Sequence, residues 1–74
     1  MENKVILLVA RVLNQDATNL SVNSSMKNVA QWDSLKQMQI IMAVEDEFKI
    51  KVSDESLFNA TSVKSLIDLV IAST

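Results

Sequence analysis

The sequence predicts an all-α fold, a four-helix bundle of three longer helices and one short third helix, with a long ordered loop between the first two helices. Three segments place apolar residues three and four positions apart, which is typical of amphipathic helices. No segment alternates apolar and polar residues as a half-buried strand does. At 74 residues the chain suffices for one small domain, which we expect to span residues 1–74.

The first helix is predicted from residue 2 to residue 13 or 14. Its apolar residues form one stripe: Val5, Leu8, Val9, Val12 and Leu13. Residues 15–31 are mostly polar, and a structureless loop of this length is unusual in a compact domain. We therefore interpret this segment as an ordered connection that four apolar side chains hold to the core. These are Leu20, Val22, Met26 and Val29.

The second helix is predicted to begin at residue 33 or 34 and to end at residue 48 or 49. After it, Ser53 can cap a short helix over residues 54–59, whose first turn carries two acidic residues. Thr61 or Ser62 can cap the last helix. The apolar residues of that helix again follow helical spacing: Val63, Leu66, Ile67, Val70 and Ile71.

The second helix has more apolar residues than one buried stripe requires. One arc contains Ile40, Ile41, Val44 and Phe48, and a neighbouring arc contains Leu35, Met38 and Met42 and continues to Glu45. Both arcs can be core if this helix lies centrally in the bundle. Alternatively, the second arc is an exposed strip for a partner protein, with adaptable methionines and an acidic border at residues 45–47. Periodicity does not decide between these two interpretations.

The composition excludes most catalytic and metal chemistry. The chain has no Gly, Pro, Cys or His, which removes thiolate nucleophiles, histidine acid/base groups, the usual zinc ligands and glycine-rich nucleotide loops. We therefore expect no catalytic residues and no metal site. A net charge of −2 disfavours nucleic acid as a partner. The apolar run at residues 5–10 is too short to insert into a membrane, so we expect a cytoplasmic protein.

Ser34 stands at the predicted start of the second helix, directly after Asp33. It can be a simple cap, since residues 34–37 match the S-x-x-Q capping box. Alternatively, Asp33 caps the helix and the serine hydroxyl remains available for covalent attachment. A phosphodiester on Ser34 would lie at the positive end of the helix, which favours an anion.

The sequence resembles the acyl carrier proteins over nearly its whole length. The resemblance is carried by Trp32-Asp33-Ser34-Leu35, by Met38, Ile40, Met42 and Val44, by the acids before Phe48, by residues 53–55 and by residues 61–63. It implies that Ser34 carries 4′-phosphopantetheine, which a phosphopantetheinyl transferase (the holo-carrier synthase) installs from coenzyme A, and that Asp33 completes the motif. The arm would hold an acyl or aminoacyl group as a thioester. The carrier itself would be a non-catalytic monomer.

The resemblance also implies where partner enzymes bind. Acyl-loading, condensing and acyltransferase enzymes would contact Leu35, Met38, Met42, Glu45 and Asp46, whereas Ile40, Val44 and Phe48 would face the interior. The sequence departs from the family at Gln31, where glycine is common, and at Lys36 and Gln39, where fatty-acid carriers place acids. Trp32 is commoner in carriers of secondary metabolism. We therefore expect a specialised lipid, polyketide or secondary-metabolite pathway with dedicated partners.

Two questions stay open at the level of sequence. The same helix surface would also suit an unmodified, carrier-like interaction module that binds a partner protein. The aliphatic core is compatible with a cavity for an acyl chain and equally with a filled interior.

Overall fold

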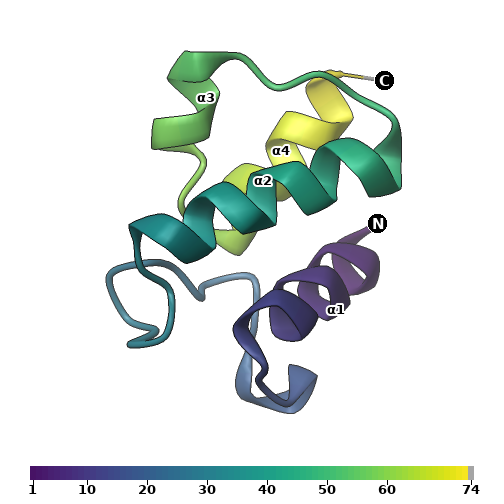
Figure 1. The fold of residues 1–74 in the computed structure, drawn as a ribbon. Helices are drawn as coiled ribbons and strands as arrows, with labels where there is room; N and C mark the ends of the chain where they lie inside the picture. Colours follow the sequence, from purple (N-terminus) through teal and green to yellow (C-terminus); the bar gives the residue numbers. More distant parts are fainter. Residues whose placement is uncertain (74) are drawn as a thin grey trace.

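The computed structural model describes residues 1–73 as four α-helices around one core, without strands in that range (Figure 1). The elements are α1 (Glu2–Leu13), the short 3-10 helix η1 (Ala17–Asn19), α2 (Ser34–Phe48), α3 (Asp54–Asn59) and α4 (Val63–Ala72). The all-α prediction is confirmed, including the short third helix and the long connection between the first two. Only η1, which lies within that connection, was not predicted.

Side-chain caps fix where three of the helices begin. Ser53 accepts a hydrogen bond from the third backbone N–H of α3, and Ser62 does the same at α4. At α4 the Ser65 side chain also bonds back to the Ser62 backbone, which completes a capping box. Both serines match the prediction. At α2 the capping side chain belongs to Asp33.

The helices α1 and α2 both end on residues other than glycine. Each helix closes on a residue in the left-handed conformation, Asn14 and Lys49, both with φ of 56°. Glycine is the common choice at this position because it has no Cβ to clash, and this chain contains none. The two helices therefore end with a backbone conformation that a side chain disfavours.

The core lies where α1, α2 and α4 meet. Its fully buried side chains are aliphatic apart from one tryptophan: Val5, Leu8, Val9, Trp32, Ile40, Val44, Val63, Leu66 and Val70. Ile41 is buried as well, and Phe48 packs half-buried against the core, so the first arc of α2 faces inward as predicted. Ile71 shared the spacing of the α4 stripe but is 57% exposed, although its neighbour Val70 in the same turn is fully buried.

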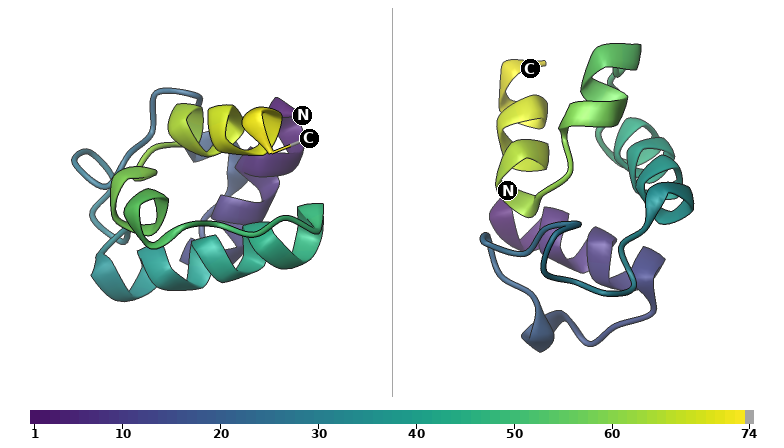
Figure 2. Two further views of the ribbon diagram at one scale, coloured as in Figure 1. Left: turned by 90° about the horizontal axis from the view of Figure 1, so that it is seen from above. Right: turned by 90° about the vertical axis from the view of Figure 1, so that its left-hand side faces the viewer.

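The helices enclose this core from three sides. α1 packs along α2, α4 packs against α1, and the short α3 lies beside the first half of α2 (Figures 1 and 2). Figure 2 shows α3 and α4 standing apart on one side of α1, with α2 running next to α3. The start of α2 and the end of α3 are thereby brought to the same end of the molecule.

The long connection is held in place by packing against the core and by backbone hydrogen bonds. Leu20, Met26 and Val29 pack against the core, and Val22 is half-buried. Two backbone hydrogen bonds join the connection to the start of α4 and to the segment before it. The Met26 N–H donates to the Thr61 carbonyl and the Val63 N–H donates to the Ser24 carbonyl, both at 2.9 Å.

Candidate functional site

Ser34 is the first residue of α2 and its side chain is exposed. Asp33 Oδ1 accepts the hydrogen bond of the Lys36 N–H at 2.9 Å, so the cap comes from the residue before the serine. Within residues 1–73, no hydrogen bond involves the Ser34 hydroxyl. Of the two interpretations of this serine, the structure supports the one in which Asp33 caps the helix and the hydroxyl stays available.

The backbone around Ser34 is suited to a negative charge. The N–H groups of Ser34 and Leu35 precede the first intrahelical hydrogen bond of α2, and therefore have no partner in the helix ladder. They also lie at the positive end of the helix dipole. An anionic group on the Ser34 oxygen would be stabilised both by these unpaired N–H groups and by the helix dipole.

Gln37 does not take part in the predicted capping box with Ser34. Its side chain is 5% exposed and joins three segments. Its Oε1 accepts the indole N–H of Trp32 at 2.8 Å, and its Nε2 donates to the carbonyls of Leu57 and Ala60 at 3.0 and 2.8 Å. This network, which we call the Gln37 network, ties the start of α2 to the end of α3.

The signal for a buried Gln37 was present in the sequence. Gln37 precedes Ile40, Ile41 and Val44 by three, four and seven positions, and so lies on the buried stripe of α2. A polar residue on such a stripe requires buried partners. Trp32 and the α3 carbonyls are those partners, and every fully buried side-chain N or O atom of residues 1–73 has one.

The second arc of α2 is exposed rather than buried. Leu35, Met38 and Met42 are 62%, 51% and 64% exposed, and Phe58 on α3 adds a fourth apolar side chain at 75%. Large apolar side chains gathered on one surface are typical of protein-binding sites. The structure therefore supports the interpretation of this arc as an exposed strip.

The two acidic residues that follow this strip, Glu45 and Asp46, differ in how freely their carboxylates can interact with a partner. Glu45 Oε2 accepts a hydrogen bond from the Val52 N–H at 2.8 Å, so one oxygen of this half-buried carboxylate holds the connection between α2 and α3. Asp46 is exposed, with its Oδ1 3.9 Å from the Lys49 ammonium. Such an exposed pair contributes little to stability. Asp46 thus presents its charge to solvent more fully than Glu45.

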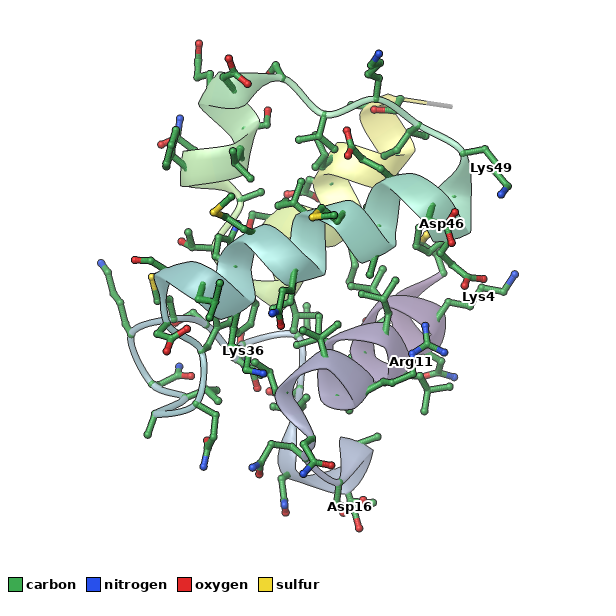
Figure 3. The ribbon with its side chains drawn as sticks, in the orientation of Figure 1. Lys4, Arg11, Asp16, Lys36, Asp46 and Lys49 are labelled. Carbon is green, nitrogen blue, oxygen red and sulfur yellow. The ribbon has the colours of Figure 1, made fainter. Side chains whose placement is uncertain are left out.

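Basic side chains lie close to the acidic end of α2. Lys4 and Arg11 of α1 line a shallow surface depression together with Glu47. Figure 3 shows Lys4 and Arg11 on the same side of the molecule as Asp46 and Lys49, whereas Lys36 lies toward the other end of α2. The negative field of this helix end is therefore partly compensated by its own chain.

A groove of about 180 Å³ opens between α2 and α3 next to Ser34. Ser34, Gln37 and Met38 contribute one wall from α2, and Leu57 and Phe58 contribute the other from α3. Met26 from the long connection and Thr61 from the segment before α4 complete the lining. The groove is mainly apolar, and Ser34 is part of its lining.

Metal ligands are not gathered anywhere in the part of the chain that the structure describes. Among residues 1–73, no three His, Cys, Asp or Glu side chains are grouped so that they could hold a metal ion. None of the helices in that range is both long and apolar enough to cross a membrane.

Comparison with known proteins points to one family. The family model described as "Phosphopantetheine attachment site" matches residues 3–70. The acyl carrier protein of Buchnera aphidicola subsp. Schizaphis graminum (strain Sg) is 31% identical over 70 residues, which cover 95% of this chain and 89% of that relative. The acyl carrier protein of Buchnera aphidicola subsp. Baizongia pistaciae (strain Bp) is 33% identical over 70 residues, with 95% and 90% covered.

Proposed function

Because this chain belongs to the family of phosphopantetheine-attachment carrier proteins, we propose that Ser34 is the attachment residue and that residues 1–74 act as one carrier domain. Proteins of this family are carriers rather than catalysts, and their cofactor is 4′-phosphopantetheine. The observation that carries the proposal is the free, exposed hydroxyl of Ser34 at a helix start that its neighbour Asp33 already caps.

Attachment requires little of the chain itself. The Ser34 oxygen attacks the phosphorus that bears the pantetheine arm of coenzyme A, loses its proton to a base of the transferase, and displaces the nucleotide portion as the old P–O bond breaks. The N–H groups of Ser34 and Leu35 then stabilise the charge of the new phosphodiester. When bound, the cofactor supplies a thiol, which this chain lacks, and that thiol holds an acyl or aminoacyl group as a thioester.

The partner enzymes bind the exposed strip of α2. Leu35, Met38 and Met42 supply its apolar area, and Asp46 with the free oxygen of Glu45 supplies the negative charge. The enzymes proposed to use this surface are a phosphopantetheinyl transferase and acyl-loading, condensing or acyltransferase enzymes. We propose that the carrier acts as a cytoplasmic monomer.

The pathway is proposed to be a specialised lipid, polyketide or secondary-metabolite pathway rather than general fatty-acid synthesis. Lys36 and the exposed Gln39 replace the acids that fatty-acid carriers place on this helix. Glu47 lies beside Lys4 and Arg11, which weakens the negative field further. We expect fatty-acid synthesis enzymes to elongate the acylated carrier far more slowly than their own carrier. Equal rates would refute this assignment.

The attachment site is tested by intact mass spectrometry after incubation with coenzyme A and a promiscuous phosphopantetheinyl transferase. The wild type should gain one phosphopantetheine mass, and Ser34→Ala should gain none. Ser73→Ala, which removes an exposed serine at the end of α4, is the matched control and should be modified like the wild type. Modification of the Ser34→Ala protein would refute the proposal.

A further inference from the structure

We propose that this carrier keeps its acyl or aminoacyl cargo outside its core, and that Gln37 is the residue that excludes an alkyl chain from the interior. Of the two interiors that the sequence left open, we thus assign the filled one rather than a cavity for an acyl chain. This inference rests on the proposed attachment at Ser34, because cargo tethered there would approach the core from the start of α2.

The groove next to Ser34 stops short of the core. Met38 and Phe58 in its lining are 51% and 75% exposed. None of the fully buried core side chains of residues 1–73 is part of that lining. Gln37 is its one buried residue, and it connects the groove to the fully buried Trp32 through a hydrogen bond. A chain that turned inward between α2 and α3 would therefore meet Gln37.

The hydrogen bonds of Gln37 are ones that an alkyl chain cannot replace. Its Nε2 donates to the carbonyls of Leu57 and Ala60, and its Oε1 accepts the indole N–H of Trp32. An alkyl chain that pushed α3 away from α2 would break the two bonds to the carbonyls. It has no donor or acceptor of its own, so the separated polar groups would lie next to hydrocarbon without partners, which is unfavourable. The Gln37 network therefore opposes entry on this side of α2.

A second contact ties the chain before α3 to the far end of α2. Glu45 Oε2 accepts the Val52 N–H at 2.8 Å, two residues before α3 begins. The segment that contains α3 is thus bound to α2 on both of its sides, by Glu45 before the helix and by Gln37 at its end (Figure 1). For α3 to move away as a unit, both contacts would have to break.

The gap between α3 and α4 is no easier an entrance. The surface depression there is lined mainly by polar side chains: Ser56, Asn59, Ser65 and Asp68. Ala60 also lines it, and the Ala60 carbonyl is one of the two acceptors of Gln37. An alkyl chain that deepened this depression would have to displace polar side chains and would again disturb the Gln37 network.

Cargo that stays outside the core remains in water. Partner enzymes then reach the thioester without first extracting the acyl chain from the carrier. A long alkyl chain would remain exposed to solvent, which is unfavourable for an apolar group. The carrier is therefore suited to short or polar acyl groups and to aminoacyl groups.

The first test loads the carrier with a carbon-13-labelled octanoyl group, using octanoyl-coenzyme A and a promiscuous phosphopantetheinyl transferase. The probes are the methyl groups of Val44, Leu66 and Val70, which are fully buried in the core. We expect no NOE between these methyl groups and the octanoyl chain. Their NMR signals should also keep the positions that they have in the carrier loaded with an acetyl group. NOEs to these buried methyl groups in the wild type would overturn the inference.

Two glutamine variants test the role of Gln37. Gln37→Ala removes the hydrogen bonds and part of the bulk, and should allow the octanoyl chain to enter and show NOEs to the buried methyl groups. Gln39→Ala removes an exposed glutamine from the same helix and is the matched control, which should behave like the wild type. If circular dichroism shows Gln37→Ala to be unfolded, Gln37→Leu takes its place with the same expected results.

Cleavage of the thioester by hydroxylamine gives a second readout. We expect the octanoyl thioester to be cleaved several-fold more slowly on Gln37→Ala than on the wild type or on Gln39→Ala. The acetyl thioester should be cleaved at the same rate on all three proteins. A loss of stability alone would not depend on the length of the cargo. Equal cleavage of the octanoyl thioester on the folded Gln37 variant and on the wild type would overturn the role of Gln37.

Failure of this inference is distinct from failure of the attachment proposal. If intact mass shows no attached arm, the attachment proposal is wrong, and the inference falls with it. If the octanoyl arm is attached to Ser34 and its chain shows NOEs to the buried methyl groups of the wild type, only the exclusion from the core is wrong.

Discussion

Replacement of Gln37 by leucine removes the hydrogen-bonding groups from the centre of the Gln37 network and keeps a side chain of similar size. The indole N–H of Trp32 then has no partner in a place that is 1% exposed to solvent. The carbonyls of Leu57 and Ala60 also lose their donor, and the contact that ties the end of α3 to the start of α2 is broken.

The cost of this change follows from the three bonds. An unpaired buried donor costs about 1–3 kcal/mol, and each of the other two bonds contributes about 0.5–1.5 kcal/mol. The Leu57 bond is only part-buried, so water replaces it in part, and the leucine gains some apolar burial. We therefore expect Gln37→Leu to lose about 2–4 kcal/mol. A chain of 74 residues has about 4–11 kcal/mol of unfolding free energy in total.

Urea unfolding followed by far-UV circular dichroism measures this loss, and a double-mutant cycle with Trp32→Phe assigns it to the network. Removal of both partners leaves no unpaired indole donor, so the double variant should lose at least about 1 kcal/mol less than the sum of the two single variants. The reasoning is refuted if Gln37→Leu loses under about 0.5 kcal/mol, a typical surface effect, or if the two losses add.

Two further changes are expected to act on stability. Lys49→Gly should raise the unfolding free energy by about 0.5–1 kcal/mol, because glycine relieves the left-handed strain at φ of 56°. Thermal unfolding measures this, and an equal gain in Lys49→Ala, which keeps the strain, would contradict it. At Asp16, hydrogen bonds from the backbone N–H and the hydroxyl of Thr18 lower the pKa below its usual 3.8. The ionised carboxylate therefore stabilises the fold above that value, and its contribution is lost as the pH falls from about 5 through the lowered pKa. Urea unfolding at stepped pH should show a smaller acid loss for Asp16→Asn, and identical slopes would rule out this role.

The helix boundaries were predictable because their determinants are local. The stripe of α1 and the serine caps of α3 and α4 lie within a few residues of the ends they set. Residue spacing also identified the buried arc of α2 with Ile40, Ile41 and Val44. Each of these features depends on sequence neighbours alone, so a single sequence carries it.

The features that periodicity left open depend on tertiary placement. Gln37 meets carbonyls that lie 20 and 23 residues further along the chain, and no local pattern specifies that encounter. The exposure of Met38 and Met42 depends on how the other helices pack around α2, which the spacing of residues within one helix does not specify. Likewise, one oxygen of Glu45 is occupied by Val52 because the chain turns back after α2. That turn reduces the acidic surface that the sequence predicted.

The burial of Trp32 makes this carrier its own fluorescent reporter. It is the only tryptophan of the chain, it lies two residues before Ser34, and its indole is hydrogen-bonded in the core. Its emission therefore originates from one known place, close to the proposed attachment residue. Any event that pulls α3 from α2 and lets water reach the indole will shift that emission to longer wavelength. Events that open the contact between α2 and α3 can thus be followed in real time on the unlabelled protein.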